Sequence, residues 1–158
     1  MKILFLNIVF CFLICSVSNG QIPVHNNQFP QPISFNPNTI LPFTAEELNK
    51  LQEVYSSSLE MEILNRPSRV LFMKEILRNR VVLKEIADPT KYKYFPLLSE
   101  VSLFKAYNPN LKRAVFFDPS TFNPIKYDFE FSSPSTQVFR VDNTNYFIII
   151  KTQHYNKL

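Results

Sequence analysis

The sequence has almost no glycine, few cysteines and no tryptophan. Its one glycine, Gly20, and its two cysteines, Cys11 and Cys15, all lie near the N-terminus, so residues 21–158 contain neither type. Loops that hold phosphate groups need glycine, because backbone N–H groups must approach the ligand closely. This absence argues against nucleotide-cofactor enzymes and against α/β-hydrolases with a nucleophile elbow. It also excludes cysteine catalysis and thiolate zinc sites in residues 21–158. We therefore expect no cofactor.

The first residues have the pattern of a secretory signal peptide. A basic Lys2 precedes a mainly apolar stretch over residues 3–17, and small residues follow at Ser18 and Gly20. This order is typical of a cleaved signal, and cleavage after Ser18 or after Gly20 fits the pattern. The apolar stretch is shorter than the about 20 residues that a membrane-spanning helix needs. We predict a signal peptide at 1–20 and a secreted, extracellular protein with no membrane anchor after cleavage and no disulfide.

Residues 21–43 form a proline-rich leader with five prolines and no charged side chain. Proline at this spacing disfavours a helix and favours an extended, polyproline-like conformation. Two interpretations follow. The leader is either an arm that docks onto a partner or a flexible segment held in part by Ile33, Phe35 and Phe43.

A change of pattern after the leader predicts two helices. Thr44 and Glu47 are spaced as a capping box, and apolar residues at helical spacing predict a first helix over about 45–64. Pro67 ends this helix. A second apolar face predicts another helix over about 69–86. Because the break between them is short, we expect an antiparallel helical pair.

The second half of the chain alternates apolar and polar residues, which is typical of strands. Five strands are predicted, at 100–107, 112–117, 125–131, 137–141 and 146–152. The short links between them favour an antiparallel meander. The predicted fold is therefore a single α+β domain over 44–158, in which the two N-terminal helices pack on a C-terminal antiparallel sheet of four to five strands.

The sequence offers two candidates for catalysis, His154 and Glu130. Asp128 and Glu130 share one face of a predicted strand, at a spacing that paired acids use in hydrolysis. Alternatively, His154 could form a general acid–base pair with Glu130, Glu100 or Arg140. A solvated sheet face explains the same carboxylates without catalysis. Neither His154 nor the second histidine, His25, has a partner at metal-ligand spacing, so we predict no metal site.

Basic residues gather on the second predicted helix, where Arg69, Lys74, Arg78 and Arg80 occur within twelve positions. Such a basic face can bind an anionic glycan, a nucleic acid or a lipid surface. Acidic residues interrupt it and the formal net charge of the chain is only +4. A solvated helix face is therefore the competing interpretation.

The chain carries 16 Phe and seven Tyr residues. They either fill a solid core or line a pocket for an apolar ligand. A long strand at 146–152 would also allow a homodimer if it lay at a sheet edge.

No motif of a known family is evident in the sequence. Our leading hypothesis is a secreted, non-enzymatic protein that binds another extracellular protein or a glycan through the proline-rich arm or the basic helix face. The alternatives are a carrier of a small apolar ligand in a Phe/Tyr-lined pocket, and a small secreted hydrolase or nuclease.

Overall fold

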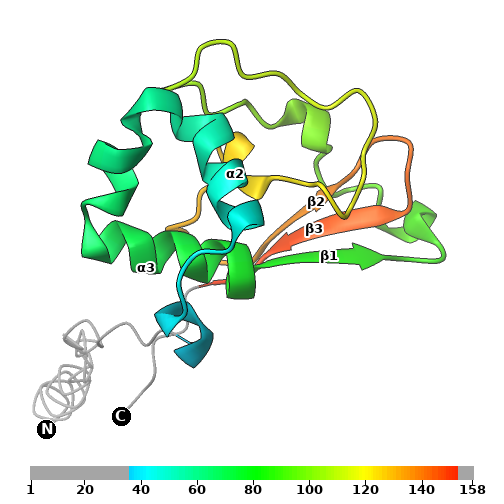
Figure 1. Cartoon of the computed structure of the whole chain (residues 1–158). Coiled ribbons are helices and arrows are strands. Elements are labelled where there is room, and N and C mark those ends of the chain that lie inside the picture. The colour runs from blue at the N-terminus through cyan, green and yellow to red at the C-terminus, as the bar shows by residue number, and fades with distance from the viewer. Residues whose placement is uncertain (1–35, 153–158) are drawn as a thin grey trace, which may run out of the picture. The chain divides into compact units, whose positions relative to one another are not determined.

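The computed structural model describes residues 36–152. The predicted signal peptide, most of the predicted leader and His154 lie outside these residues. The described part has an α+β fold, with helices first and an antiparallel sheet formed by residues further along the chain (Figure 1). No helix within residues 36–152 is long and apolar enough to cross a membrane. These residues contain no cysteine, so no disulfide holds them together.

The first predicted helix forms but is interrupted. Helix α2 (Ala45–Tyr55) begins with the predicted capping box, in which the Glu47 N–H donates to Thr44 Oγ1 over 3.2 Å and the Thr44 N–H donates to Glu47 Oε2 over 2.8 Å. At Ser56 the backbone leaves the helix with a φ of 50°. A 3₁₀ turn (Ser56–Ser58) and a π-helical turn (Glu60–Leu64) complete the region. Three consecutive serines explain the break, because serine favours turns over helix interiors.

The second predicted helix ends earlier than expected. Helix α3 (Pro67–Glu75) continues as a π-helical turn (Ile76–Arg80), and the chain then becomes strand β1 (Val81–Glu85). The prediction of helix over 81–86 was therefore wrong. Val81 and Val82 are β-branched, which favours an extended backbone, and they pair with a strand near the C-terminus.

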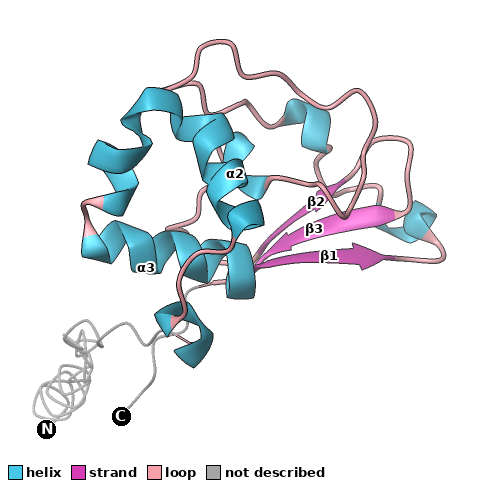
Figure 2. Cartoon of the chain, in the orientation of Figure 1, coloured by secondary structure: helices cyan, strands magenta, loops and turns pink. Residues whose placement is uncertain are grey.

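The sheet has three strands in the order β1-β3-β2, all antiparallel (Figure 2). Strands β2 (Gln137–Arg140) and β3 (Tyr146–Ile150) lie where the sequence predicted them. Asn143 has a φ of 55° in the turn between them, a conformation that asparagine tolerates better than most residues. Strand β3 lies at the centre of the sheet, so the edge position that a homodimer through this strand requires is not present.

The three other predicted strands, at 100–107, 112–117 and 125–131, do not form. An isolated bridge between Leu103 and Tyr127 is the only ladder contact between them in the described structure. Short 3₁₀ turns occur at Leu98–Glu100 and Pro124–Lys126. Prolines in the segment remove backbone donors and disfavour continuous ladders. The predicted alternation itself is real, because Tyr127 and Phe129 are buried while Asp128 between them is exposed.

The described residues have two apolar clusters. The first lies among the helices and includes Leu51, Val54, Ile63 and Ile76, each with no exposed surface. The second covers one face of the sheet. It consists of Leu98, Tyr127, Phe129, Val141, Ile148 and Ile150. The sheet face is thus buried mainly by the irregular segment 97–131. The sequence predicted that the helical pair covers the sheet. In the structure, the segment 97–131 covers most of this face instead.

Residues 36–43, from the predicted leader, pack against α3 and the turn after it. Arg78 donates to the backbone carbonyls of Asn38, Leu41 and Pro42. Its Nε and Nη2 also bond the two carboxylate oxygens of Glu47 over 2.6 and 2.7 Å. Both side chains are largely buried, with 12% and 13% of their surface exposed. One guanidinium therefore ties this segment to α2 and to the turn after α3.

We expect Arg78→Ala to lower the free energy of unfolding by about 3 kcal/mol, because it leaves a largely buried carboxylate without its partner. Urea denaturation measures this value. The control is Arg69→Ala at an exposed position of α3, which should change it by less than about 0.5 kcal/mol. Equal effects of the two substitutions would contradict a special role for Arg78.

Stability should also depend on the ionisation of Glu47. Hydrogen bonds from Arg78 hold the pKa of Glu47 below its usual value of 4.5. Because the folded-state pKa is the lower one, charged Glu47 stabilises the fold above about pH 4.5, and this contribution is lost as the pH falls through the folded-state pKa. We expect the free energy of unfolding to fall less steeply below pH 4.5 in Glu47→Gln than in the wild type. Identical pH profiles in urea denaturation would show that Glu47 is not a source of the acid sensitivity.

Candidate ligand cleft

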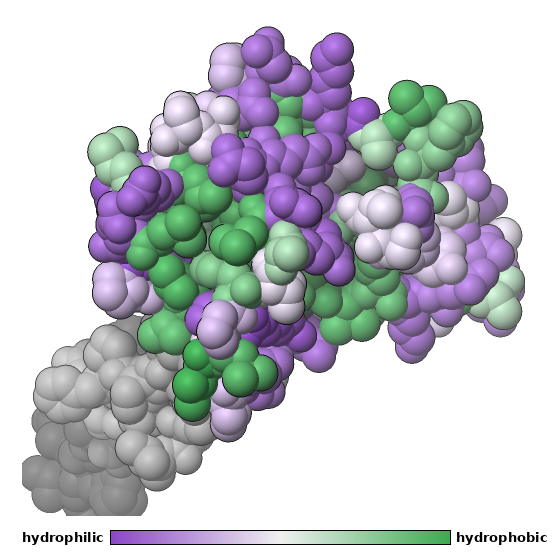
Figure 3. All heavy atoms as spheres, viewed as in Figure 1, coloured by the Kyte–Doolittle hydropathy of each residue, from purple (hydrophilic) through white to green (hydrophobic). Residues whose placement is uncertain are grey.

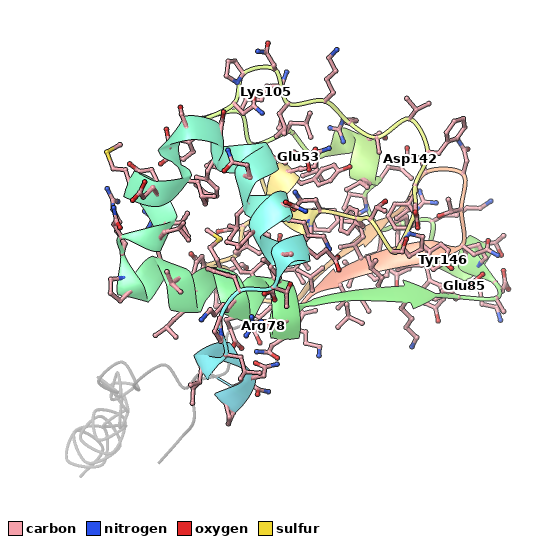
Figure 4. All side chains as sticks on the ribbon, in the orientation of Figure 1. Glu53, Arg78, Glu85, Lys105, Asp142 and Tyr146 are labelled. Atoms are coloured by element: carbon pink, nitrogen blue, oxygen red, sulfur yellow. The ribbon has the colours of Figure 1, made fainter. Side chains whose placement is uncertain are left out.

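A cleft of about 440 Å³ lies between α2, the 3₁₀ turn Leu98–Glu100, the loop 113–118 and the end of strand β2. Glu53 reaches it from α2, and Asp142 reaches it from the turn between β2 and β3 (Figure 4). The residues that form the cleft are far apart in the sequence. It exists only because the irregular segment 97–131 folds over the sheet.

Aromatic rings form much of the cleft lining. The lining includes a row of three neighbouring rings, those of Phe117, Phe122 and Tyr127. The ring centroids of Phe117 and Phe122 are 5.4 Å apart, and those of Phe122 and Tyr127 are 5.6 Å apart. Burial raises the pKa of Tyr127, so its phenol stays neutral at physiological pH. The cleft therefore offers apolar ring faces and edges to a bound molecule.

Arg113 holds the loop 113–118 in place beside the cleft through its side-chain contacts. Its guanidinium donates to the carbonyl of Leu98 over 2.9 Å and to the carbonyl of Val101. The same group lies over the ring of Tyr127, 5.4 Å from the ring centroid. Arg113 thus joins the loop to the neighbouring turn and to the aromatic wall, in place of the strand pairing that the sequence predicted.

The polar end of the cleft is built around Asn123 and Glu53. Asn123 Nδ2 donates to the carbonyl of Lys50 and to Glu53 Oε2, each over 2.9 Å. Lys126 Nζ lies 2.6 Å from the other Glu53 oxygen. Asn123 is only 4% exposed, and its Oδ1 has no hydrogen-bond partner in the described part of the chain. A buried acceptor without a partner is costly, so this position calls for a donor.

Two further carboxylates line the cleft. Asp142 accepts hydrogen bonds from Ser99, over 3.0 Å from its N–H and 2.5 Å from its hydroxyl. Asp118 accepts from the N–H and hydroxyl of Ser120, and these bonds lower the pKa of Asp118. Neither carboxylate forms an ion pair within residues 36–152.

Apolar side chains are exposed at the rim. Apolar surface is visible on the face of the molecule that Figure 3 shows. The two most exposed large apolar residues of the described chain are Val115, with 87% of its surface exposed, and Phe116, with 85%. Both belong to the loop that Arg113 holds. Exposed apolar residues beside a cleft are typical of a binding site.

The four residues of the predicted basic face do not share one exposed surface. Arg69 is exposed, but Lys74 is buried with its ammonium 5.2 Å from the ring centroid of Phe43. Arg78 is committed to Glu47 and to carbonyls, and Arg80 is buried with its Nε donating to the Lys151 carbonyl over 3.0 Å. A binding role for this helix stays a prediction that rests on Arg69.

The predicted catalytic pair stays a prediction, because one of its members lies outside the described residues. Glu130 is exposed and does not line the cleft, and His154 lies outside residues 36–152. Within that range no group of three or more His, Cys, Asp or Glu side chains is placed to hold a metal ion.

Sequence reasoning missed the residues that build the cleft. Arg113 fell within a predicted strand, and Asn123 fell within a turn-rich stretch without a recognised role. No sequence motif marked Glu53 or Asp142 as a functional residue. The one available signal was the run "AVFF" between charged residues at 114–117, which an ordinary strand explains equally well. No family model, curated protein or solved structure matches this chain.

We expect the hydrogen bonds of Asn123 at the polar end of the cleft to contribute to the stability of the fold. We expect Asn123→Ala to lower the free energy of unfolding by about 2 kcal/mol, because two acceptors lose their donor. Asn123→Asp should cost more, since it places a second carboxylate beside Glu53 and removes the same donor. Thermal and urea denaturation measure both effects, with exposed Asn110→Ala as the control. A less destabilised Asn123→Asp would contradict the assigned amide orientation.

Proposed function

We propose that this protein is a non-enzymatic binding protein that holds a small ligand with an apolar or aromatic body in the cleft beside Arg113. The observation that carries the proposal is the combination of cleft volume and lining. About 440 Å³ lies within the range of small-molecule sites. Aromatic walls with a few placed polar groups are also typical of such sites. This corresponds to the carrier hypothesis drawn from the aromatic-rich sequence.

The chemistry of the cleft supports binding over catalysis. Residues 36–152 contain no histidine and no cysteine, so this part of the chain offers no histidine base to a nucleophile in the cleft. Glu53 is engaged by Lys126 and Asn123, and Asp142 is engaged by Ser99. These contacts fix side-chain positions, which suits a preorganised binding site.

Two parts of the broader hypothesis remain predictions. Secretion rests on the pattern at 1–20, which lies outside the described residues. Docking through a proline-rich arm rests on residues 21–43, of which 21–35 lie outside the described residues and 36–43 pack against α3 and the turn after it. Recognition of an extracellular protein or a glycan through the basic helix has less support than the cleft, because Lys74, Arg78 and Arg80 have structural contacts.

The cleft hypothesis can be tested by filling the cleft. Ala114 lines it and is exposed, so Ala114→Trp adds bulk at the opening without removing a buried contact. We expect the wild-type protein to bind the neutral fluorescent dye Nile red and Ala114→Trp to bind it about tenfold more weakly or worse, a change of about 1.4 kcal/mol or more. Fluorescence titration measures both affinities.

The matched control is Ala87→Trp, at an exposed alanine that does not line the cleft. It adds the same side chain and should leave dye affinity unchanged. Melting temperatures confirm that both variants fold. Equal dye affinity of Ala114→Trp and the wild type would contradict the proposal.

A further inference from the structure

The charges of the cleft are not balanced within the described residues. Three carboxylates line it, on Glu53, Asp118 and Asp142, against the cations of Arg113 and Lys126. Lys126 is neutralised by Glu53 at 2.6 Å. Neither Asp118 nor Asp142 forms an ion pair within residues 36–152. Arg113 is the remaining cation of the lining, so the cleft carries one net negative charge.

Both cations of the cleft already have contacts within the described residues. Arg113 already donates to the carbonyls of Leu98 and Val101 and stacks over Tyr127. Lys126 is held by Glu53 and only 13% of its side chain is exposed. A bound carboxylate or phosphate would meet the negative charges of Asp118 and Asp142 beside a guanidinium that is already partly engaged.

A ligand that carries hydrogen-bond donors and a positive charge fits the same groups. Ring faces of Phe and Tyr attract cations, and the rings of Phe116, Phe117 and Phe122 line the cleft. The buried Oδ1 of Asn123 lacks a donor, and Asn123 belongs to the cleft wall. Less than 1 Å² of this oxygen is exposed, so a ligand N–H reaches it only when the surrounding side chains move.

We propose that the cleft selects small organic amines, with an aromatic or alkyl body against the Phe and Tyr rings and a protonated nitrogen facing Asp118 and Asp142. This inference rests on the proposed function and specifies the chemical class of its ligand. The carboxylates supply the charge selection and the rings supply the apolar contact. Asn123 Oδ1 supplies a further acceptor for the ligand nitrogen.

Three probes of similar shape test the charge selection on the full chain. Phenethylamine, phenethyl alcohol and hydrocinnamate share a phenyl ring and a short chain, and they are positive, neutral and negative at neutral pH. We expect the dissociation constant of the amine to be lower than that of the alcohol by about tenfold. Hydrocinnamate should bind most weakly. Isothermal titration or ligand-observed NMR gives the three values.

Substitution of the carboxylates tests their role. Asp142→Asn and Asp118→Asn keep the side-chain shape and an acceptor for Ser99 or Ser120, and each should weaken amine binding while leaving alcohol binding unchanged. Asp88→Asn is the matched control, because Asp88 accepts hydrogen bonds from Thr90 in an equivalent exposed turn and does not line the cleft. It should leave both affinities unchanged.

The outcomes distinguish this inference from the proposed function. If the alcohol binds as tightly as the amine and Ala114→Trp abolishes both, the cleft binds ligands but does not select amines, and only the inference fails. Preferential binding of hydrocinnamate, or loss of amine binding in Asp88→Asn to the same extent as in Asp142→Asn, also overturns the inference. If neither Nile red nor any of the three probes binds in the cleft, both proposals fail.

Discussion

Hydrogen bonds from long polar side chains to backbone carbonyls hold this structure together where regular pairing is absent. Arg78 binds the carbonyls of the segment 38–42, Arg113 binds those of Leu98 and Val101, and Arg140 binds that of Phe95 over 2.9 Å. Between β1 and β2 the described chain forms no strand, so its carbonyls have few ladder partners. A carbonyl buried without a partner costs about 1–3 kcal/mol. A guanidinium offers five donors in a fixed geometry, so one arginine satisfies several of them.

This use of arginine also shapes the candidate cleft. A regular strand pairing over 112–117 would place the loop in the sheet, whereas the contacts of Arg113 hold it beside Tyr127 and leave a cleft. Arginines that bind carbonyls are not available as an exposed basic face. In the proposed site, a ligand would meet the aromatic rings and the carboxylates of Asp118 and Asp142, beside the guanidinium of Arg113. The same contacts that replace regular secondary structure thus give the cleft its chemical character.

The predictable parts of the fold are those that depend on nearby residues. The capping box at Thr44, the helix after it and the strands at 137–141 and 146–152 follow from local pattern. Strand β1 was missed because its pairing partner is Tyr146–Ile150, more than sixty positions away, while its apolar residues also fit a helical spacing. The alternation over 125–131 correctly predicted which side chains are buried, but alternation does not supply a neighbouring strand. Side-chain contacts such as those of Arg113 and Asn123 leave no periodic signal, so the cleft was not predictable from the sequence.

The most direct test of this account is amide hydrogen exchange of the Arg113→Lys variant. Lysine keeps the charge but cannot donate to two carbonyls in a fixed geometry while stacking over Tyr127. The account predicts that amides in segments 97–101 and 111–118 exchange faster than in the wild type by about tenfold, while those of β3 are protected as before. Arg69→Lys, at an exposed position, should leave both segments unchanged. Unchanged exchange around the cleft in Arg113→Lys would contradict the claim that guanidinium contacts replace strand pairing there.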